Sequence, residues 1–178
     1  MITQRLEIRR FKNEDLNDIY NYLSDSEVVK YEPYKSLNEK QCSEYLDTMV
    51  SGNDFWAIVL KETNTVIGQV YLANSSPYLW ELGYVFNSKY QHKGYASEAV
   101  SRLLQYIFEK QDAHRVSAHC NVENKASWKL LERIGFRREG HFLQNVYFFT
   151  DEEDQPLWQD TYEYGCLHSD FKKGNQLK

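Results

Sequence analysis

The chain has 178 residues, 42% of them hydrophobic and 26% charged, with a formal net charge of −5 and a pI of about 5.6. This length predicts one domain over residues 1–170, followed by a loose tail over 171–178, and the 14 Tyr and 9 Phe argue against a disordered chain. The negative charge argues against a nucleic-acid partner, because phosphates select basic surfaces. It mildly favours a cationic substrate, although acidity of this size also serves solubility alone.

The three cysteines, Cys42, Cys120 and Cys166, lie far apart and form no Cys-x-x-Cys pair. They predict buried thiols rather than a disulfide framework or a zinc ribbon. The five histidines show no metal-ligand spacing, so no metal is expected. The charged N-terminus does not resemble a signal peptide, and the longest apolar run, residues 55–60, is too short to cross a bilayer. We therefore expect a cytoplasmic protein without a membrane partner.

The first third of the chain predicts a strand followed by two helices. Near alternation of apolar and charged residues indicates the strand at residues 4–11. Asn13 can cap the first helix. Asn38 and Gln41 form a capping box for the second helix, which should end near Gly52.

From residue 55 onward the hydrophobic period changes from 3.6 to 2, and later returns to 3.6 in a strongly periodic helix. Strands are expected at residues 55–61, 66–73, 78–86, 114–120, 136–149 and 159–168. Helices are expected at residues 94–110 and 125–133, the second of which stops at Gly135. An acidic tip at residues 151–154 joins the last two strands. This order predicts an α/β fold in which a mixed sheet carries helices on both faces.

One strand–loop–helix unit carries the clearest chemical signal. The strand ends near Phe86, and the helix opens near Gly94 with first-turn amides that have no intrahelical partner. The helix dipole adds about half a positive charge at that end. Lys93 adds a cation, and Gly94 lets backbone approach closely. The unit therefore predicts an anion site that cradles phosphate, although it is neither a Walker loop nor a dinucleotide fingerprint.

Around this unit the sequence resembles the GNAT N-acetyltransferases. The family's Q/R-x-x-G-x-G/A signature is matched by Gln91-His92-Lys93-Gly94-Tyr95-Ala96. Residues 81–86 resemble the preceding strand, and residues 124–140 resemble the second cofactor segment. The closing strand of the branch containing ribosomal-protein N-terminal acetyltransferases is matched by Trp158, Asp160 and Tyr164. The four blocks occur in the family's order and together cover nearly the whole chain.

The resemblance implies a mixed, mostly antiparallel sheet of about seven strands, with helices on both faces. A V-shaped gap should open between two parallel strands, residues 78–86 and 114–120. Acetyl-CoA is the implied co-substrate, with its pantetheine arm on open backbone groups near Val85 and Phe86 and its pyrophosphate on the amides of Gln91 to Ala96. The implied cofactor-binding residues are Val85, Phe86, Gln91, His92, Lys93, Gly94, Tyr95, Ala96, Asn124 and Ser127.

Acetyl transfer to an amine requires proton loss from the amine, a donor for the oxyanion and departure of a thiolate. Backbone N–H near Val85 could hold the oxyanion. Glu81 is the candidate base, the alternative being a solvated strand carboxylate. Many relatives place a proton-donating Tyr where this chain has Leu131. Ser127 matches a proposed donor of the branch, although it could merely cap its helix.

The expected activity is transfer of an acetyl group from acetyl-CoA to the N-terminal amine of a protein, such as a ribosomal protein. A small amine, such as a polyamine or an antibiotic, is the alternative acceptor. A non-catalytic acyl-CoA-binding module is a third reading. The chain could act as a monomer or a homodimer. The acceptor pocket could be lined by Tyr20, Tyr22, Tyr31 and Tyr34, unless these residues serve packing.

Overall fold

Seven strands form one mixed sheet in the order β1-β2-β3-β4-β5-β7-β6 in the computed structural model, which describes residues 1–171. The strands are β1 (Leu6–Arg9), β2 (Phe55–Leu60), β3 (Thr65–Ser76), β4 (Leu79–Phe86), β5 (Arg115–Asn121), β6 (Arg137–Val146) and β7 (Gln159–Leu167). All neighbouring pairs are antiparallel except β4 and β5. The predicted mixed, mostly antiparallel α/β sheet is confirmed.

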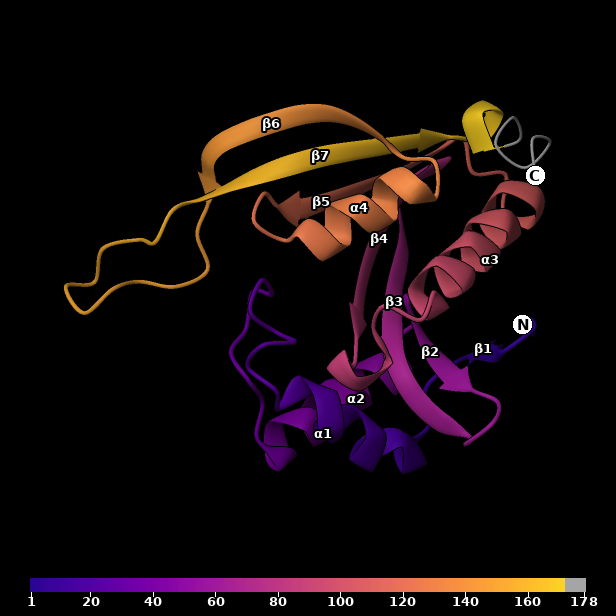
Figure 1. Cartoon of the computed structure of the whole chain (residues 1–178), viewed down its shortest axis with the longest axis horizontal. Helices are drawn as coiled ribbons and strands as arrows, with labels where there is room; N and C mark the ends of the chain where they lie inside the picture. Colours follow the sequence, from indigo (N-terminus) through magenta and orange to yellow (C-terminus); the bar gives the residue numbers. More distant parts are fainter. Residues whose placement is uncertain (172–178) are drawn as a thin grey trace.

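Helices cover both faces of this sheet, as predicted (Figure 1). They are α1 (Leu16–Leu23), α2 (Glu39–Ser51), α3 (Tyr95–Lys110) and α4 (Lys125–Arg133). Two separate hydrophobic clusters form, one with α1 and α2 and the other with α3 and α4. Alternation along β2 divides its side chains between the clusters, since Ile58 and Leu60 join the α3 side while Ala57 and Val59 join the α1 side.

Of the two helix caps predicted from the sequence, one forms and one does not. The capping box of α2 forms, because Gln41 N donates to Asn38 Oδ1 at 3.0 Å and Asn38 N donates to Gln41 Oε1 at 2.9 Å. The prediction that Asn13 caps α1 is wrong. Residues 13–15 form a 3₁₀ turn, and the Asp15 carboxylate accepts from Lys12 N at 2.9 Å. The Asp15 carboxylate also forms an ion pair with Arg9 at 2.7 Å, which fixes its position. A charged carboxylate is a stronger hydrogen-bond acceptor than the neutral side-chain amide of Asn13.

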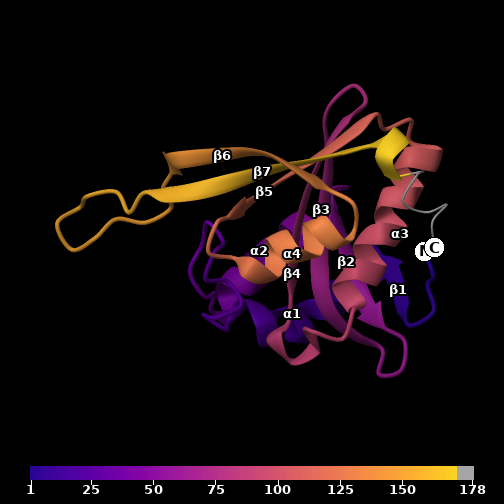
Figure 2. The same ribbon diagram turned by 45° about the horizontal axis from the view of Figure 1, so that its top comes forward.

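Strands β4 and β5 pair over only part of their length. Leu79 to Glu81 lie beside Arg115 to Ser117 in parallel register, and the pairing stops there. Residues 82–86 continue beside β3 and residues 118–121 continue beside β7, so the two strands diverge (Figure 2). The predicted V-shaped gap between these two strands is therefore present.

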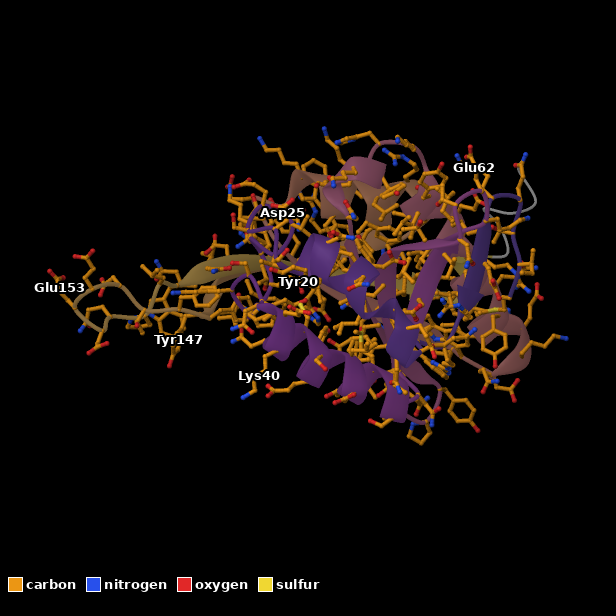
Figure 3. All side chains as sticks on the ribbon, turned by 90° about the horizontal axis from the view of Figure 1, so that it is seen from below. Tyr20, Asp25, Lys40, Glu62, Tyr147 and Glu153 are labelled. Carbon is orange, nitrogen blue, oxygen red and sulfur yellow. The ribbon has the colours of Figure 1, made fainter. Side chains whose placement is uncertain are left out.

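The connection between β6 and β7, residues 147–158, forms an arm that projects from the body of the molecule (Figure 1). Glu153 of the predicted acidic tip lies at its far end (Figure 3). Phe171, which the sequence placed in a tail, instead packs on Phe108 with ring centroids 5.3 Å apart. Residues 172–178 of that tail lie outside the described residues. No helix within residues 1–171 has the length and apolarity to cross a bilayer.

Candidate functional site

Two cavities meet at the V-shaped gap. The first, of about 410 Å³, is walled by β2, β3, the divergent halves of β4 and β5, and residues 31–34; we call it the aromatic cavity. The second, of about 570 Å³, lies against residues 90–97 and α4; we call it the helix-terminus cavity. Six residues line both cavities and define their junction: Tyr31, Glu32, Tyr84, Val85, Asn124 and Ser127.

Backbone geometry at the helix-terminus cavity suits an anion. His92 and Gly94 both adopt left-handed conformations, with φ of 59° and 81°, in the loop that leads into α3. Gly94 is the N-cap and supplies no side-chain oxygen, so no side-chain cap covers the first amides of the helix. Such left-handed turns at a helix start gather N–H groups into an anion-binding concavity. Five of the six signature residues line it: Gln91, His92, Gly94, Tyr95 and Ala96.

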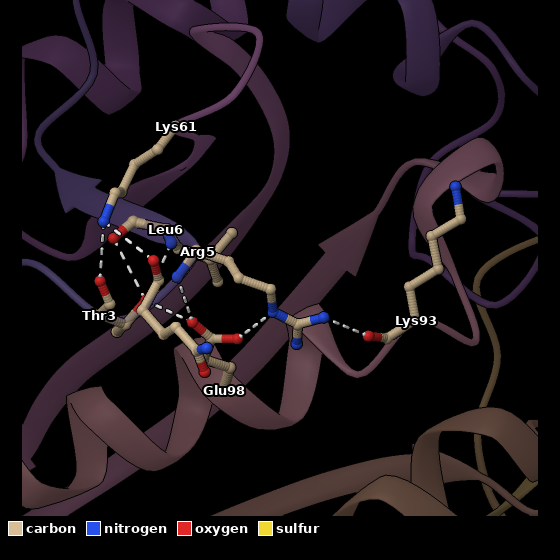
Figure 4. Close-up of polar contacts among 7 residues, drawn as sticks. Thr3, Arg5, Leu6, Lys61, Lys93 and Glu98 are labelled. Atoms are coloured by element: carbon tan, nitrogen blue, oxygen red, sulfur yellow. Dashed lines mark hydrogen bonds and ion pairs between the residues drawn. The ribbon is translucent and has the colours of Figure 1, made fainter.

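Lys93 departs from its predicted role. It does not line the cavity, and its carbonyl accepts from Arg5 Nη1 at 2.9 Å (Figure 4). The cationic side chains on this cavity are instead Lys129 and Arg133 of α4. These two residues are four positions apart and therefore share a helix face. This spacing can be read from the sequence, but the direction in which the face points cannot.

Glu98 anchors the first turn of α3 to the N-terminal segment. Its Oε2 lies 2.7 Å from Arg5 Nε, and its Oε1 accepts from Thr3 Oγ1 at 2.6 Å and from Arg5 N at 2.9 Å (Figure 4). Burial raises the pKa of Glu98, but these hydrogen bonds outweigh burial and lower the pKa overall. Because Arg5 also binds the carbonyl of Lys93, one residue ties the loop and the helix start together.

Backbone direction decides which residues of β4 face the gap. Just before β4, the carbonyl of Tyr78 accepts a hydrogen bond from Arg115 N of β5 at 3.2 Å. Just after β4, Asn87 N donates to the carbonyl of Ile67 of β3 at 3.0 Å. Backbone groups alternate along a strand. Tyr84 and Phe86 therefore direct their N–H and C=O groups toward the gap, and Val85 directs its own toward β3. Of the two residues near which open backbone was expected, Phe86 therefore faces the gap and Val85 does not, although Val85 still lines the junction.

A pair of hydroxyl groups occupies the junction. The phenol oxygen of Tyr84 lies 3.0 Å from Ser127 Oγ and 3.1 Å from the Ser127 carbonyl. Asn124 Oδ1 accepts from Ser127 N at 3.1 Å and thereby caps α4. Leu131 is buried in the core, as an apolar residue requires. Burial raises the pKa of Tyr84 well above its ordinary value, so its hydroxyl stays protonated.

Cys120 lies beside these hydroxyls on the wall of the aromatic cavity. Burial raises the pKa of its thiol to about 11, an effect that a hydrogen bond with Ser127 only partly offsets. A neutral thiol is a poor nucleophile. The junction therefore offers proton donors rather than a residue that would carry a covalent group.

Aromatic residues dominate the lining of the aromatic cavity; they are Tyr31, Tyr34, Tyr45, Phe55, Tyr71, Tyr84 and Phe148. Of the four tyrosines that the sequence singled out, Tyr31 and Tyr34 line it. Tyr22 is buried in the core instead, and its hydroxyl donates to Gln69 Oε1 at 3.1 Å. Tyr20 lies on the outer surface of α1 (Figure 3).

The aromatic cavity is acidic. Glu81 lies on its wall as predicted, half exposed, with its Oε1 4.0 Å from His119 Nδ1. Glu32 is a second carboxyl, which the sequence reading missed because it lies in the irregular segment between α1 and α2. Burial raises the pKa of Glu32 to about 7. No Lys or Arg occurs among the described residues that line this cavity, so it suits a cationic ligand.

Comparisons with known proteins agree with this geometry. Residues 5–137 match the family described as the acetyltransferase (GNAT) domain. An uncharacterized N-acetyltransferase of Bacillus subtilis (strain 168), YnaD, is 34% identical over 171 residues, which cover 95% of this chain and 97% of that protein. A GNAT-family acetyltransferase structure from Bacillus anthracis superposes with a TM-score of 0.87 at 32% identity, covering 95% of this chain and 98% of the other.

Two more distant relatives have named acceptors. The spermidine N(1)-acetyltransferase of Vibrio cholerae is 26% identical and covers 82% of this chain, which in turn covers 87% of that enzyme. The ribosomal protein uS5-alanine N-acetyltransferase of Escherichia coli is 25% identical, with 79% of each chain covered. The branch that the sequence resembles is thus represented among its relatives, beside an enzyme for a small amine.

Proposed function

Since this chain belongs to the GNAT N-acetyltransferase family and is an acetyltransferase, we propose that the helix-terminus cavity binds acetyl-CoA and that the aromatic cavity admits a primary amine. One observation carries this proposal. An anion-binding cavity and an acidic, aromatic cavity share a junction at the divergence of β4 and β5. A thioester that enters from one side and an ammonium group that enters from the other would meet there.

The residues present fit the donor. The amides of Gln91 to Ala96, with Lys129 and Arg133, suit a pyrophosphate, and the gap-facing backbone of Tyr84 and Phe86 suits a strand-like amide arm. When bound, acetyl-CoA supplies an activated acetyl thioester. Among the cofactor-binding residues that the family resemblance implies, Asn124, Ser127 and Val85 line the junction.

Proton handling falls to side chains at the junction. Ser127 is positioned to donate a proton to a leaving sulfur, and the adjacent hydroxyl of Tyr84 can replace that proton. The gap-facing N–H groups of Tyr84 and Phe86 are suited to an oxyanion. Glu81, which the sequence suggests as the base, lies on the wall of the aromatic cavity, and its carboxylate attracts the ammonium group into that cavity.

The N-terminus of a protein is the acceptor that we propose first. The arm of residues 147–158 begins at the aromatic cavity, because Phe148 lines that cavity. Tyr147, Leu157 and Trp158 expose apolar surface along the arm, and the acidic tip lies at its end. An extended polypeptide with its first residue in the cavity would contact this surface, and basic residues would complement the tip.

A small amine with two or more positive charges is the second candidate. The observation that favours it is the pair of carboxyl groups, Glu32 and Glu81, in a cavity of about 410 Å³. Two carboxyls can bind two cationic centres of one molecule, while the aromatic wall contacts the alkyl segment between them by cation–π and apolar contacts.

Release of free thiol from acetyl-CoA tests the proposal. Purified protein is assayed with peptides bearing free N-termini, the same peptides with blocked N-termini, and a series of mono-, di- and polyamines. Turnover with free but not blocked peptides supports the first acceptor, and turnover with polyamines alone supports the second. Binding of acetyl-CoA without thiol release in any mixture would leave the acyl-CoA-binding module as the function.

A further inference from the structure

We propose that Glu32 is a catalytic residue, the carboxylate that receives the acceptor's ammonium group and takes its proton. This assignment rests on the proposed function and names the base of the same site. It differs from the sequence-based expectation, which gave the proton to Glu81.

Position distinguishes the two carboxyls. Glu32 lines both cavities and so lies at their junction, where an amine nitrogen has to meet the thioester. Glu81 lines only the aromatic cavity, at the last paired position of β4 and β5, before the gap opens. Its side chain is also half exposed beside His119, whereas the surroundings of Glu32 are largely desolvated. A base must lie within hydrogen-bond reach of the proton that it removes, which favours Glu32.

The segment between α1 and α2 holds Glu32 over the gap. Glu32 N donates to the carbonyl of Val29 at 2.9 Å, and Val29 is buried in the α1–α2 cluster. On the other side, the Tyr31 hydroxyl donates to the carbonyl of Glu123 at 3.3 Å, in the connection between β5 and α4. The segment therefore crosses from one wall of the site to the other, and contacts on both sides fix the backbone around Glu32.

The electrostatic surroundings leave Glu32 ready to accept a proton. Burial raises its pKa to about 7, near the pH at which cytosolic enzymes work. The titratable and charged groups that line the two cavities with Glu32 are Glu27, Tyr31 and Tyr34 of the segment between α1 and α2, Tyr45 of α2, Tyr71 of β3, Glu81 and Tyr84 of β4, Tyr90 and His92 of the loop, Tyr95 of α3, His119 and Cys120 of β5, and Lys129 and Arg133 of α4. Within residues 1–171, no salt bridge engages the Glu32 carboxylate, so an incoming ammonium group would be its ion-pair partner.

The resulting step balances. The ammonium nitrogen gives one proton to the Glu32 carboxylate and keeps its lone pair. That lone pair forms the C–N bond to the acetyl carbon, while the C=O π electrons move onto oxygen. When the carbonyl re-forms, the C–S bond breaks and its electron pair leaves on sulfur. A second nitrogen proton reaches sulfur through the hydroxyls of Tyr84 and Ser127, and Glu32 returns its proton to water, so the products are an amide, a thiol and one H⁺.

Glu32→Gln tests this role, with Glu62→Gln as the matched control because Glu62 lies in the exposed turn between β2 and β3 (Figure 3). With an acceptor found by the thiol-release screen, Glu32→Gln should lower kcat by about 10²-fold or more while the calorimetric Kd for acetyl-CoA changes less than about twofold. The rise of kcat/KM through pH 7 should disappear. Glu32→Ala should show the same loss, which guards against an effect of the amide itself. Glu62→Gln should match the wild type.

A readout that needs no turnover accompanies the kinetics. In protein labelled with ¹³C at glutamate carboxyls, the resonance missing from Glu32→Gln should titrate near pH 7. A midpoint near 4.5, or a kcat within threefold of wild type in Glu32→Gln, would overturn the assignment. A raised KM with unchanged kcat in Glu32→Gln would show that Glu32 binds the acceptor without taking its proton, which would overturn its assignment as the base. Failure of the proposed function is distinct, because the wild type would then release no thiol with any amine.

Discussion

The phenol oxygen of Tyr84, on β4, lies 3.0 Å from the Oγ of Ser127, on the first turn of α4. The two residues are 43 positions apart in the chain. Their contact places a tyrosine hydroxyl at the junction although α4 itself carries Leu131 where many relatives of this family have Tyr. The proton donor that we propose for the site is therefore a pair of hydroxyl groups drawn from two elements.

Removing either hydroxyl should slow proton delivery. Ser127→Ala should lower kcat by about tenfold to 10²-fold, the lower part of the range for a positioned acid, because a CoA thiolate leaves fairly readily. Tyr84→Phe should cause a similar loss, and the double variant should be little worse than either single one, since both act on one proton. The measurement is kcat at saturating acetyl-CoA and acceptor. Losses that multiply in the double variant would show that the hydroxyls act separately, and a loss below threefold in each would make them structural.

Gly94 should be required for donor binding because of its conformation. With φ of 81°, an added Cβ is strained and would lie 3.4 Å from Arg5 Nη2. Gly94→Ala should cost about 1–2 kcal/mol of stability and weaken acetyl-CoA binding by about tenfold, as measured by denaturant melts and calorimetry. Gly135→Ala is the control. Its φ is 98° with open space around a Cβ, so stability should fall while acetyl-CoA affinity is kept. Equal loss of affinity in both variants would contradict a specific role for the loop.

The raised pKa of Glu32 also predicts a pH dependence of stability. The folded value is about 7 against an ordinary value of 4.5, so between these pH values the folded state binds more protons than the unfolded state. Stability therefore falls as pH rises from about 4.5 to 7. Glu32→Gln removes this loss. The variant should match the wild type near pH 4.5 and exceed it at pH 8 by up to about 3 kcal/mol, less where solvent screens the carboxyl. If the free energies of unfolding of the wild type and Glu32→Gln differ by the same amount at every pH, the Glu32 carboxyl is solvated and its pKa is not raised.

Cys120 should be dispensable for transfer. Its thiol has a pKa of about 11 because it is buried, so it is protonated at neutral pH and does not accept the acetyl group. Cys120→Ser should keep kcat within about threefold of wild type. Mass spectrometry of the wild type mixed with acetyl-CoA, without acceptor, should show no added acetyl mass on the fragment that contains residue 120. An acetylated Cys120 that is consumed by acceptor would reverse this conclusion.

Core substitutions in α3 should be costly at both central leucines. Leu103 and Leu104 are each fully buried in the α3–α4 cluster. Leu→Ala at either position should destabilise the protein by about 2–5 kcal/mol through lost burial and the cavity left behind. Glu109→Ala, at an exposed position of the same helix, should change stability by less than about 0.5 kcal/mol. A cost below about 1 kcal/mol at both leucines would contradict the burial of this helix face.

Features that depend on neighbours along the chain could be predicted from the sequence alone. The apolar stripe of α3, the capping box of Asn38 and Gln41, and the stop of α4 at Gly135 are all local, because helix periodicity and helix caps are set within one or two turns. The order of helices and strands followed from the same patterns. Together with the matched motif of residues 91–96, they indicated the family and predicted a phosphate-binding loop before any contact was known.

Tertiary structure decided everything that depends on where β4 and β5 part. The divergence brings Glu32, Tyr84 and Ser127 to one junction from three different elements. The hydrogen-bonded partners of β4 fix which amides face the gap, so the open backbone groups belong to Tyr84 and Phe86 rather than to Val85. No local pattern marks a carboxyl in an irregular segment as buried. Its pKa is a property of the surrounding chain, because desolvation depends on residues that are distant in sequence and close only in the fold.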